Sequence, residues 1–104
     1  MPYFVLSYEV VDDFVNKRTP FRPAHLKEVR DAHERGDIVM AGALGEPSEA
    51  LIIFRGQDRS TAENFATNDP YVKSGIVKKW TVRPWTVVVG QDPSETPPGL
   101  PPSP

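Results

Sequence analysis

A chain of 104 residues with a formal net charge of −2 has the length of a single domain and no strong electrostatic character. The near-neutral balance argues against nucleic acid as a partner, because binding it needs a concentrated basic face, and the absence of cysteine excludes a disulfide scaffold or a thiolate zinc site. No apolar run approaches the ~20 residues of a membrane-spanning helix, and no signal-peptide pattern opens the chain, so we expect a cytoplasmic protein without a membrane partner.

The first predicted element is a strand at residues 3–9, which are rich in aromatic and β-branched side chains. Apolar residues lie on both of its faces, which is typical of an interior strand. Its small polar residue, Ser7, shares one face with Tyr3 and Val5, because strand residues two apart point the same way. Residues 12–21 are polar and basic, and we interpret them as a loop.

A helix is predicted over residues 23–35. Pro23 suits its first turn, where a missing N–H costs nothing, and Gly36 is expected to end it in a left-handed conformation. We expect His33 on the buried side of this helix, as a core residue rather than a ligand. The apolar residues recur at helical spacing and form one stripe, made of Leu26, Val29 and Ala32.

Two strands joined by a short turn follow this helix. Residues 37–44 and 50–55 are apolar runs, and the turn between them, at residues 45–48, is short enough for an antiparallel hairpin. Gly42 is unusual inside a strand. It indicates either a bulge or a point where a ligand or another backbone comes close.

A second helix is predicted over residues 58–68. Its start fits two capping arrangements, a capping box of Ser60 with Glu63 or a cap by the side chain of Asp58. Its end is expected at Asp69, because a residue that is followed by proline avoids helical backbone angles.

The last strand is predicted over residues 76–89, and Pro84 within it requires an edge position, a bend or a bulge. Because this run is long for one strand, we expect it to divide at Arg83–Pro84, with the second half able to reach a partner chain.

We assign residues 1–90, which contain all the predicted strands and helices, to one α+β domain. Residues 91–104 are rich in proline and predict a disordered or polyproline-like tail, with binding to a proline-recognising protein as the alternative.

The predicted order is strand, helix, strand, strand, helix, strand. Right-handed crossovers then give a ferredoxin-like α+β fold, in which a four-stranded antiparallel sheet carries two helices on one face. The other face of the sheet is left without a covering layer, although the strands have apolar residues on both faces. A second subunit packed sheet to sheet is the simplest cover, so we expect a homodimer.

Several motifs, taken together and in this order, resemble the YciI-like, or YCII-related, family over residues 1–90. The motifs are Tyr3-Phe4-Val5, Lys17-Arg18, Arg22-Pro23-Ala24-His25-Leu26, Gly36, Ala41-Gly42, Asp69-Pro70-Tyr71-Val72 and Gly75. The resemblance implies a dimeric α+β barrel, in agreement with the topology above. It also implies an active site built on a histidine and an aspartate, which correspond to His25 and Asp69. One related branch contains a dehydrochlorinase that acts on a chlorinated hydroxyhydroquinone.

His25 and Asp69 form a combination suited to proton transfer. A histidine works as a general base or acid near neutral pH, and a carboxylate on one ring nitrogen fixes the tautomer and stabilises the imidazolium that forms. Each residue also has a structural interpretation. His25 can make a hydrogen bond that only holds the helix start, and Asp69 can cap local backbone N–H groups after the helix.

Three further residues are candidates for binding a substrate. Arg22 can clamp a carboxylate or phenolate with its planar fork, or pair with a surface acid. Ser7 can donate a hydrogen bond into the pocket or be an ordinary packed strand serine, and Tyr71 can line the pocket or belong to the core. The two histidines are not at the spacing that metal sites favour, and no glycine-rich phosphate loop follows the first strand, so we expect no metal and no cofactor.

The sequence leaves three functions open. The first is a small cofactor-independent enzyme that moves a proton on a small polar or aromatic substrate, in an elimination, an isomerisation or a hydrolysis. The second is a module that binds a small ligand without chemistry. The third is a dimerisation domain in which the His-Asp pair is only structural.

Overall fold

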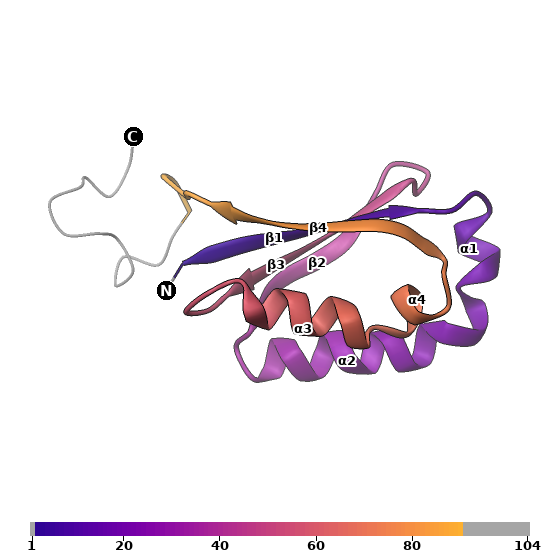
Figure 1. Ribbon diagram of the computed structural model, residues 1–104, viewed down its shortest axis with the longest axis horizontal. Helices are drawn as coiled ribbons and strands as arrows, with labels where there is room; N and C mark the ends of the chain where they lie inside the picture. The colour runs from indigo at the N-terminus through magenta and orange to yellow at the C-terminus, as the bar shows by residue number, and fades with distance from the viewer. Residues whose placement is uncertain (1, 91–104) are drawn as a thin grey trace, which may run out of the picture.

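The computed structural model describes residues 2–90 as a four-stranded sheet with its helices packed on one face (Figure 1). The strand order is β2-β3-β1-β4, and every neighbouring pair is antiparallel. The elements in chain order are β1 (Tyr3–Val10), α1 (Phe14–Lys17), a 3-10 helix (Thr19–Phe21), α2 (Arg22–Glu34), β2 (Ile38–Leu44), β3 (Glu49–Arg55), α3 (Ser60–Asn68), α4 (Pro70–Lys73) and β4 (Val77–Trp85). The predicted ferredoxin-like α+β fold is therefore confirmed, and the predicted tail at residues 91–104 lies outside the described residues.

Strand β1 is the centre of the molecule because it pairs with both β3 and β4. Its side chains alternate strictly, as strand geometry requires. One set is buried against the helices, and the other set, which includes Val5 and Ser7, faces the open side of the sheet. The buried set is Phe4, Leu6, Tyr8 and Val10, and these residues form the middle of the hydrophobic core.

Two short helices and a 3-10 turn occur in addition to the two predicted helices. The loop expected at residues 12–21 contains α1, because Phe14 is buried in the core and holds that turn against the sheet. Helix α4 follows α3 directly, since Pro70 cannot continue α3 but suits the first turn of a new helix.

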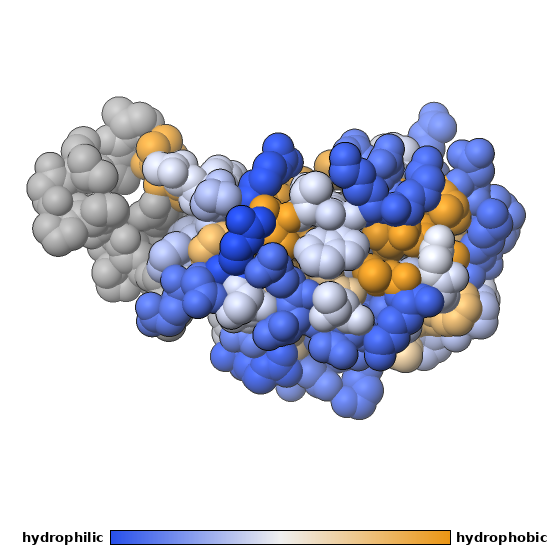
Figure 2. Space-filling view, in the orientation of Figure 1, coloured by the Kyte–Doolittle hydropathy of each residue, from blue (hydrophilic) through white to orange (hydrophobic). Residues whose placement is uncertain are grey.

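Figure 2 shows that the outer surface of the helical layer is mostly hydrophilic, with apolar residues visible where the helices meet the sheet. None of the helices within residues 2–90 is long and apolar enough to cross a membrane.

The end of α2 agrees with the capping pattern in the sequence, and the start of α3 agrees only in part. Gly36 follows α2 with a left-handed backbone (φ 89°), as its position after the helix predicts. At the start of α3 the N-cap residue is Arg59, which makes no side-chain capping bond, and the side chain of Asp58, one residue earlier, accepts the backbone N–H of Ser60. His33, however, is exposed rather than buried. His33 directly follows Ala32, the buried residue of α2. One step along a helix turns the side chain by about 100° around the axis, which takes His33 off the buried side.

One of the two interpretations of Gly42 is wrong, and so is the predicted division of the last strand. The irregularity in β2 lies between Ile38 and Met40, whereas Gly42 sits in regular register opposite Leu51 and marks no bulge. The other interpretation of Gly42, a close approach of a ligand or another backbone, stays a prediction. Strand β4 does not divide at Pro84, because it lies at the edge of the sheet and a proline there need not supply an N–H to an outer strand. The strand ends at Trp85 because its partner β1 begins opposite that residue.

Candidate active site

The first turn of α2 and the junction between α3 and α4 bring His25 and Asp69 together. Nδ1 of His25 lies 2.8 Å from Oδ1 of Asp69, a residue 44 positions further along the chain. Pro70 keeps Asp69 out of the helical conformation (φ −69°, ψ 126°). This backbone ends α3, begins α4 and leaves the carboxylate beside the start of α2.

The Asp69 carboxylate is fully buried and hydrogen-bonded on both oxygens. Its exposed fraction is 0%. Oδ1 accepts the backbone N–H of Tyr71 at 2.9 Å in addition to the His25 contact, and Oδ2 accepts the Tyr8 hydroxyl at 2.6 Å. Burying a carboxylate is very unfavourable unless such partners are present. Asp69 therefore caps the local backbone, as its structural interpretation predicts, and contacts His25 at the same time.

This arrangement selects one tautomer of the His25 ring. A carboxylate that accepts from Tyr8 and from the Tyr71 backbone needs a hydrogen on Nδ1 to bind the histidine as well. In the neutral ring the other nitrogen, Nε2, then carries a lone pair. Among residues 2–90, no hydrogen bond to Nε2 occurs, and the His25 side chain is 13% exposed. The ring is thus held by one nitrogen and available through the other.

Aromatic packing fixes the plane of the imidazole. The His25 ring stacks on the Tyr71 ring, with centroids 3.8 Å apart and planes 11° apart. Phe14 contacts the same tyrosine edge to face at 5.4 Å. Both aromatic residues are buried, so the histidine is held by a hydrogen bond at its edge and by a packed ring on its face.

A pocket of about 250 Å³ opens beside this histidine, between the start of α2 and strands β2 and β3. Its floor is made of small residues, Ala41, Ala43 and Ala50, which leave space that larger side chains would fill. Two arginines, Arg18 and Arg22, line it together with His25. The pocket therefore combines an imidazole, an aromatic wall and two cations within a volume of about 250 Å³.

The structure brings four of the five candidate residues together. His25, Arg22 and Tyr71 line the pocket, and Asp69 lies directly behind His25. Ser7 is not brought to this pocket. It points to the opposite face of the sheet, where its hydroxyl oxygen lies 3.4 Å from a guanidinium nitrogen of Arg83.

Sequence reasoning missed Tyr8 and Arg18 as site residues. A signal for Tyr8 exists in the alternation of β1, which places a phenol among buried apolar residues, where a buried hydroxyl needs a partner. Arg18 belongs to a basic run in a segment expected to be a loop, and no pattern in that segment shows which cation faces inward. The short helix α1 decides this, because its buried Phe14 ring lies 5.4 Å from the Arg18 guanidinium carbon.

The charge of Asp69 also affects groups around it. Burial, and after it the negative charge of Asp69, raises the pKa of the Tyr8 hydroxyl far above its ordinary value, so Tyr8 stays protonated and can act only as a donor to the carboxylate. Burial and the same charge raise the pKa of Glu28, one turn after His25 on α2.

Within residues 2–90, no group of three or more histidine or acidic side chains is arranged to hold a metal ion.

Comparison with known sequences identifies similar proteins along most of the chain. A family model described as the YCII-related domain matches residues 1–86. Proteins named YciI from Escherichia coli O6:H1 and Shigella flexneri are each 28% identical over 98 residues, covering 85% of this chain and 99% of theirs. An uncharacterized protein from Haemophilus influenzae is 26% identical over 96 residues, covering 83% of this chain and 98% of its own.

Comparison with solved structures finds the same fold. The 5-chloro-2-hydroxyhydroquinone dehydrochlorinase from Burkholderia phenoliruptrix, in complex with 2,5-dihydroxybenzoquinone, matches with a TM-score of 0.68 at 19% identity, over 81% of this chain and 93% of that one. A NIPSNAP domain protein from Burkholderia xenovorans matches with a TM-score of 0.53 at 9% identity, over 84% and 94% of the two chains. At these identities the likeness concerns the fold alone.

The hydrogen bond from Tyr8 to Asp69 predicts a specific loss of stability. Tyr8→Phe removes the donor to a buried carboxylate oxygen and should lower the free energy of unfolding by about 1–3 kcal/mol, measured by urea denaturation. Tyr71→Phe is the matched control, since it removes a hydroxyl that makes no hydrogen bond within residues 2–90 and should cost less. Equal losses in the two variants would contradict the assigned role of Tyr8.

The raised pKa of Glu28 predicts a dependence of stability on pH. Because its folded pKa lies above its unfolded value, the folded state loses stability as pH rises from the ordinary glutamate range, about 4.3, through the raised value. Glu28→Gln should therefore raise Tm at pH 7 relative to wild type, and the gain should vanish below about pH 4. Thermal unfolding across this range checks the sign. A Glu28→Gln variant that is less stable than wild type at pH 7 would show that the carboxylate is stabilising.

Proposed function

The chain belongs to the YCII-related family, and from this premise we propose that it is a small enzyme that uses His25 and Asp69 for general acid/base chemistry and needs no cofactor. One observation carries the proposal: His25 is hydrogen-bonded through Nδ1 to a fully buried carboxylate while its ring lines a pocket that contains two arginines. A histidine that only stabilised the start of α2 would need neither the pocket nor the cations.

In the proposed mechanism Nε2 of His25 takes a proton from the substrate. The proton leaves the substrate for the imidazole, and Asp69 stabilises the imidazolium through the Nδ1 hydrogen bond. Arg18 and Arg22 bind an anionic oxygen of the substrate, a role that suits the planar fork of a guanidinium. Tyr71 and Phe14, which pack against each other at the site, supply apolar contact for the substrate's ring. The favoured substrate class is therefore a small aromatic or quinone-like acid.

Elimination is the reaction class that we favour among elimination, isomerisation and hydrolysis. One solved structure with this fold is named as a dehydrochlorinase and is a complex with 2,5-dihydroxybenzoquinone. In such a reaction one ring hydroxyl first gives its proton to the chlorine-bearing carbon as the ring shifts to its keto tautomer. The base then takes the proton of a second hydroxyl, the O–H electron pair forms a C=O bond, the ring double bond shifts toward the C–Cl carbon, and chloride leaves with the electron pair of the C–Cl bond, which gives a hydroxyquinone. The two arginines would stabilise the negative charge that develops on a ring oxygen.

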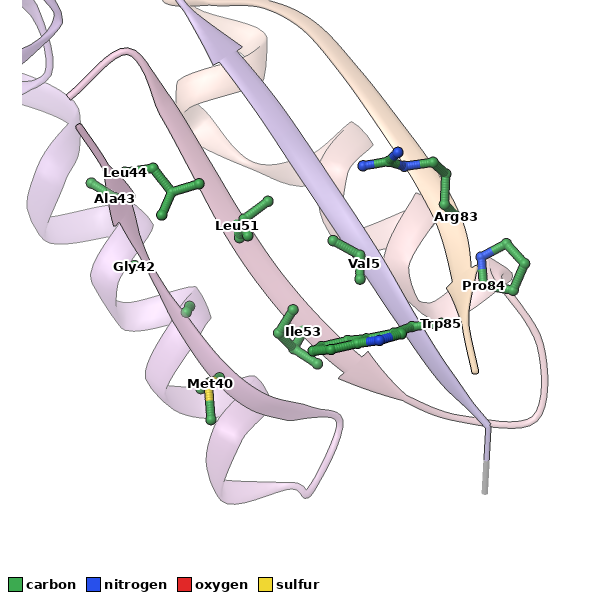
Figure 3. A pocket seen from close by; sticks show the side chains of 11 residues that line it. Val5, Met40, Gly42, Ala43, Leu44, Leu51, Ile53, Arg83, Pro84 and Trp85 are labelled. Atoms are coloured by element: carbon green, nitrogen blue, oxygen red, sulfur yellow. The ribbon is translucent and has the colours of Figure 1, made fainter. Parts of the chain in front are cut away.

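A homodimer through the open face of the sheet is part of the proposal. Figure 3 shows side chains of Val5, Leu51, Ile53 and Trp85 on this face, and they line a groove of about 620 Å³. At its border Met40 is 64% exposed and Leu44 is 44% exposed. Contiguous exposed apolar surface of this kind marks interaction sites. A second copy of the chain would cover it with the same residues, as a two-fold axis allows.

A module that only binds a ligand is the second candidate, because the same pocket can hold a small acid without reaction. The two functions differ in what His25 contributes. An enzyme loses turnover but keeps its affinity when His25 loses its basic nitrogen, whereas a binding module has no turnover to lose.

We expect the wild-type protein to release chloride from 5-chloro-2-hydroxyhydroquinone under anaerobic conditions. His25→Gln and Asp69→Asn should each reduce the rate at least a hundredfold, the lower range of what a positioned acid/base group contributes. Ion-selective detection of chloride measures the rate, and calorimetric titration with 2,5-dihydroxybenzoquinone measures binding. His25→Gln should retain this binding.

Arg22→Gln should weaken the binding of 2,5-dihydroxybenzoquinone about tenfold. Arg30→Gln is the matched control, because Arg30 is on the same helix but does not line the pocket. Binding without chloride release in wild type would favour the binding module. Chloride release that survives His25→Gln would contradict the proposed base.

A further inference from the structure

The pocket beside His25 has two ends of different chemistry. Its reactive end contains His25, Arg18 and Arg22, which all come from the segment that leads into the first turn of α2. Away from that end, the lining that α2, β2 and β3 provide has only aliphatic side chains. We call this second part the apolar arm, and its residues are Leu26 and Val29 on α2, Ala41 and Ala43 on β2, and Ala50 and Ile52 on β3.

Pairing within the sheet places the apolar arm directly beside the reactive end. Ala43 pairs with Ala50, and Ala50 pairs with Tyr8, so the three residues form one row across the sheet. Tyr8 adjoins the reactive end through its hydrogen bond to the buried carboxylate. The next row on the same face is Ala41 with Ile52. Two residues along a strand span about 7 Å, so the arm extends about that far from the reactive end.

Helix α2 continues the apolar lining in the same direction. Val29 follows His25 by four residues, which is about one turn or 6 Å along the axis, and it stays on the same side of the helix. Val29 and Ala41 also line the next hollow between α2 and β2, which places them near each other at the far end of the arm. The helix and the strand therefore enclose one continuous apolar space that begins at His25.

The side chains of the described residues do not fill this space. Ala41 and Ala43 are on the helix-facing side of the sheet, where Leu6 and Tyr8 are buried, yet both alanines are exposed. Protein interiors are close-packed, so a helix on a sheet normally leaves no such hollow. The whole pocket has a volume of about 250 Å³, whereas a cavity of about 150 Å³ is enough to bind benzene. A single ring at the reactive end therefore leaves room in the arm.

We propose that the apolar arm binds an aliphatic substituent of the substrate, so that the preferred substrates are hydroxylated rings that carry a short alkyl group. The inference rests on the proposed function and specifies the substrate class of the same site. In the bound substrate the anionic oxygens lie beside Arg18 and Arg22, the ring lies at His25, and the alkyl group extends between Val29 and Ala41. Each methylene that moves from water into the arm strengthens binding about fourfold.

Calorimetric titration of the full chain with three quinones tests the arm. The compounds are 2,5-dihydroxybenzoquinone, its 3-propyl derivative and its 3-(2-hydroxyethyl) derivative. The propyl compound should bind at least tenfold more tightly than the parent, because its three carbons leave water. The hydroxyethyl group has nearly the same size, and it should lose most of this gain because the arm offers no polar side chain to its hydroxyl.

Two leucine variants show where the substituent binds. Ala41→Leu fills the far end of the arm and should remove the preference for the propyl compound over the parent. Ala24→Leu is the matched control, because Ala24 is also exposed but does not line the pocket. This control should keep the wild-type preference. The parent compound is the internal reference, since the preference is the ratio of two dissociation constants measured on the same variant.

The outcomes separate this inference from the function on which it rests. Wild-type protein that binds the parent but binds the propyl compound no more tightly would overturn the apolar arm and leave the proposed chemistry intact. A preference that persists in Ala41→Leu would also overturn it, because the alkyl group would then lie elsewhere. Tight binding of the propyl compound without chloride release from 5-chloro-2-hydroxyhydroquinone would support the arm and contradict the proposed chemistry. Failure to bind any of the three quinones would overturn both.

Discussion

The buried carboxylate of Asp69 is the constraint on which the rest of the site depends. A carboxylate with no exposed surface must receive hydrogen bonds from the protein, and here three donors come from three elements: Tyr8 on β1, His25 on α2 and the Tyr71 backbone on α4. Loss of Tyr8 would leave the buried Oδ2 unpaired, whereas Oδ1 would keep one donor if either His25 or the Tyr71 N–H were lost. The sheet, the long helix and the α3–α4 junction are thereby held in one relative position. That position places His25 beside the pocket.

The pocket follows from the same constraint. Asp69 fixes the start of α2, so the volume of the pocket depends on the strand residues opposite that helix. These are the small residues Ala41, Ala43 and Ala50, which leave the space open. Larger residues at these positions would add core contacts and remove the space. The two arginines add positive charge to the pocket, and the ring of Tyr71 forms a flat wall. The three alanines therefore reduce core packing at the place where the proposed chemistry needs space.

The sequence predicted the fold well because the fold depends on local patterns. The aromatic and β-branched content of residues 3–9, the helical spacing in residues 23–35 and the stop at Asp69 each report a local preference. Together they limit the topology to few arrangements. The end of β4 at Trp85 could not be read in the same way, because it depends on where β1 begins. The short helix at residues 14–17 depends on the burial of a single side chain, Phe14.

The site was predicted less completely because its contacts are long-range. The pairing of His25 with Asp69 came from the family resemblance, since the spacing of the two residues alone left structural alternatives open. Ser7 was assigned correctly to the same face of the strand as Val5. Periodicity cannot tell which face the helices cover, and they cover the face opposite to Ser7. Tyr8 was missed for the converse reason. It was part of the predicted strand, but only the folded chain shows that its hydroxyl meets Asp69.

The most direct test of this account is the tautomer of His25, measured by ¹⁵N NMR of the imidazole at a pH where the ring is neutral. The account predicts a proton on Nδ1 and a bare Nε2 in the wild-type protein, because Asp69 binds the Nδ1 hydrogen. It also predicts that this preference is lost in Asp69→Asn. A wild-type ring with its proton on Nε2 and a bare Nδ1 would contradict the account, because the nitrogen that faces the pocket could then not accept a proton.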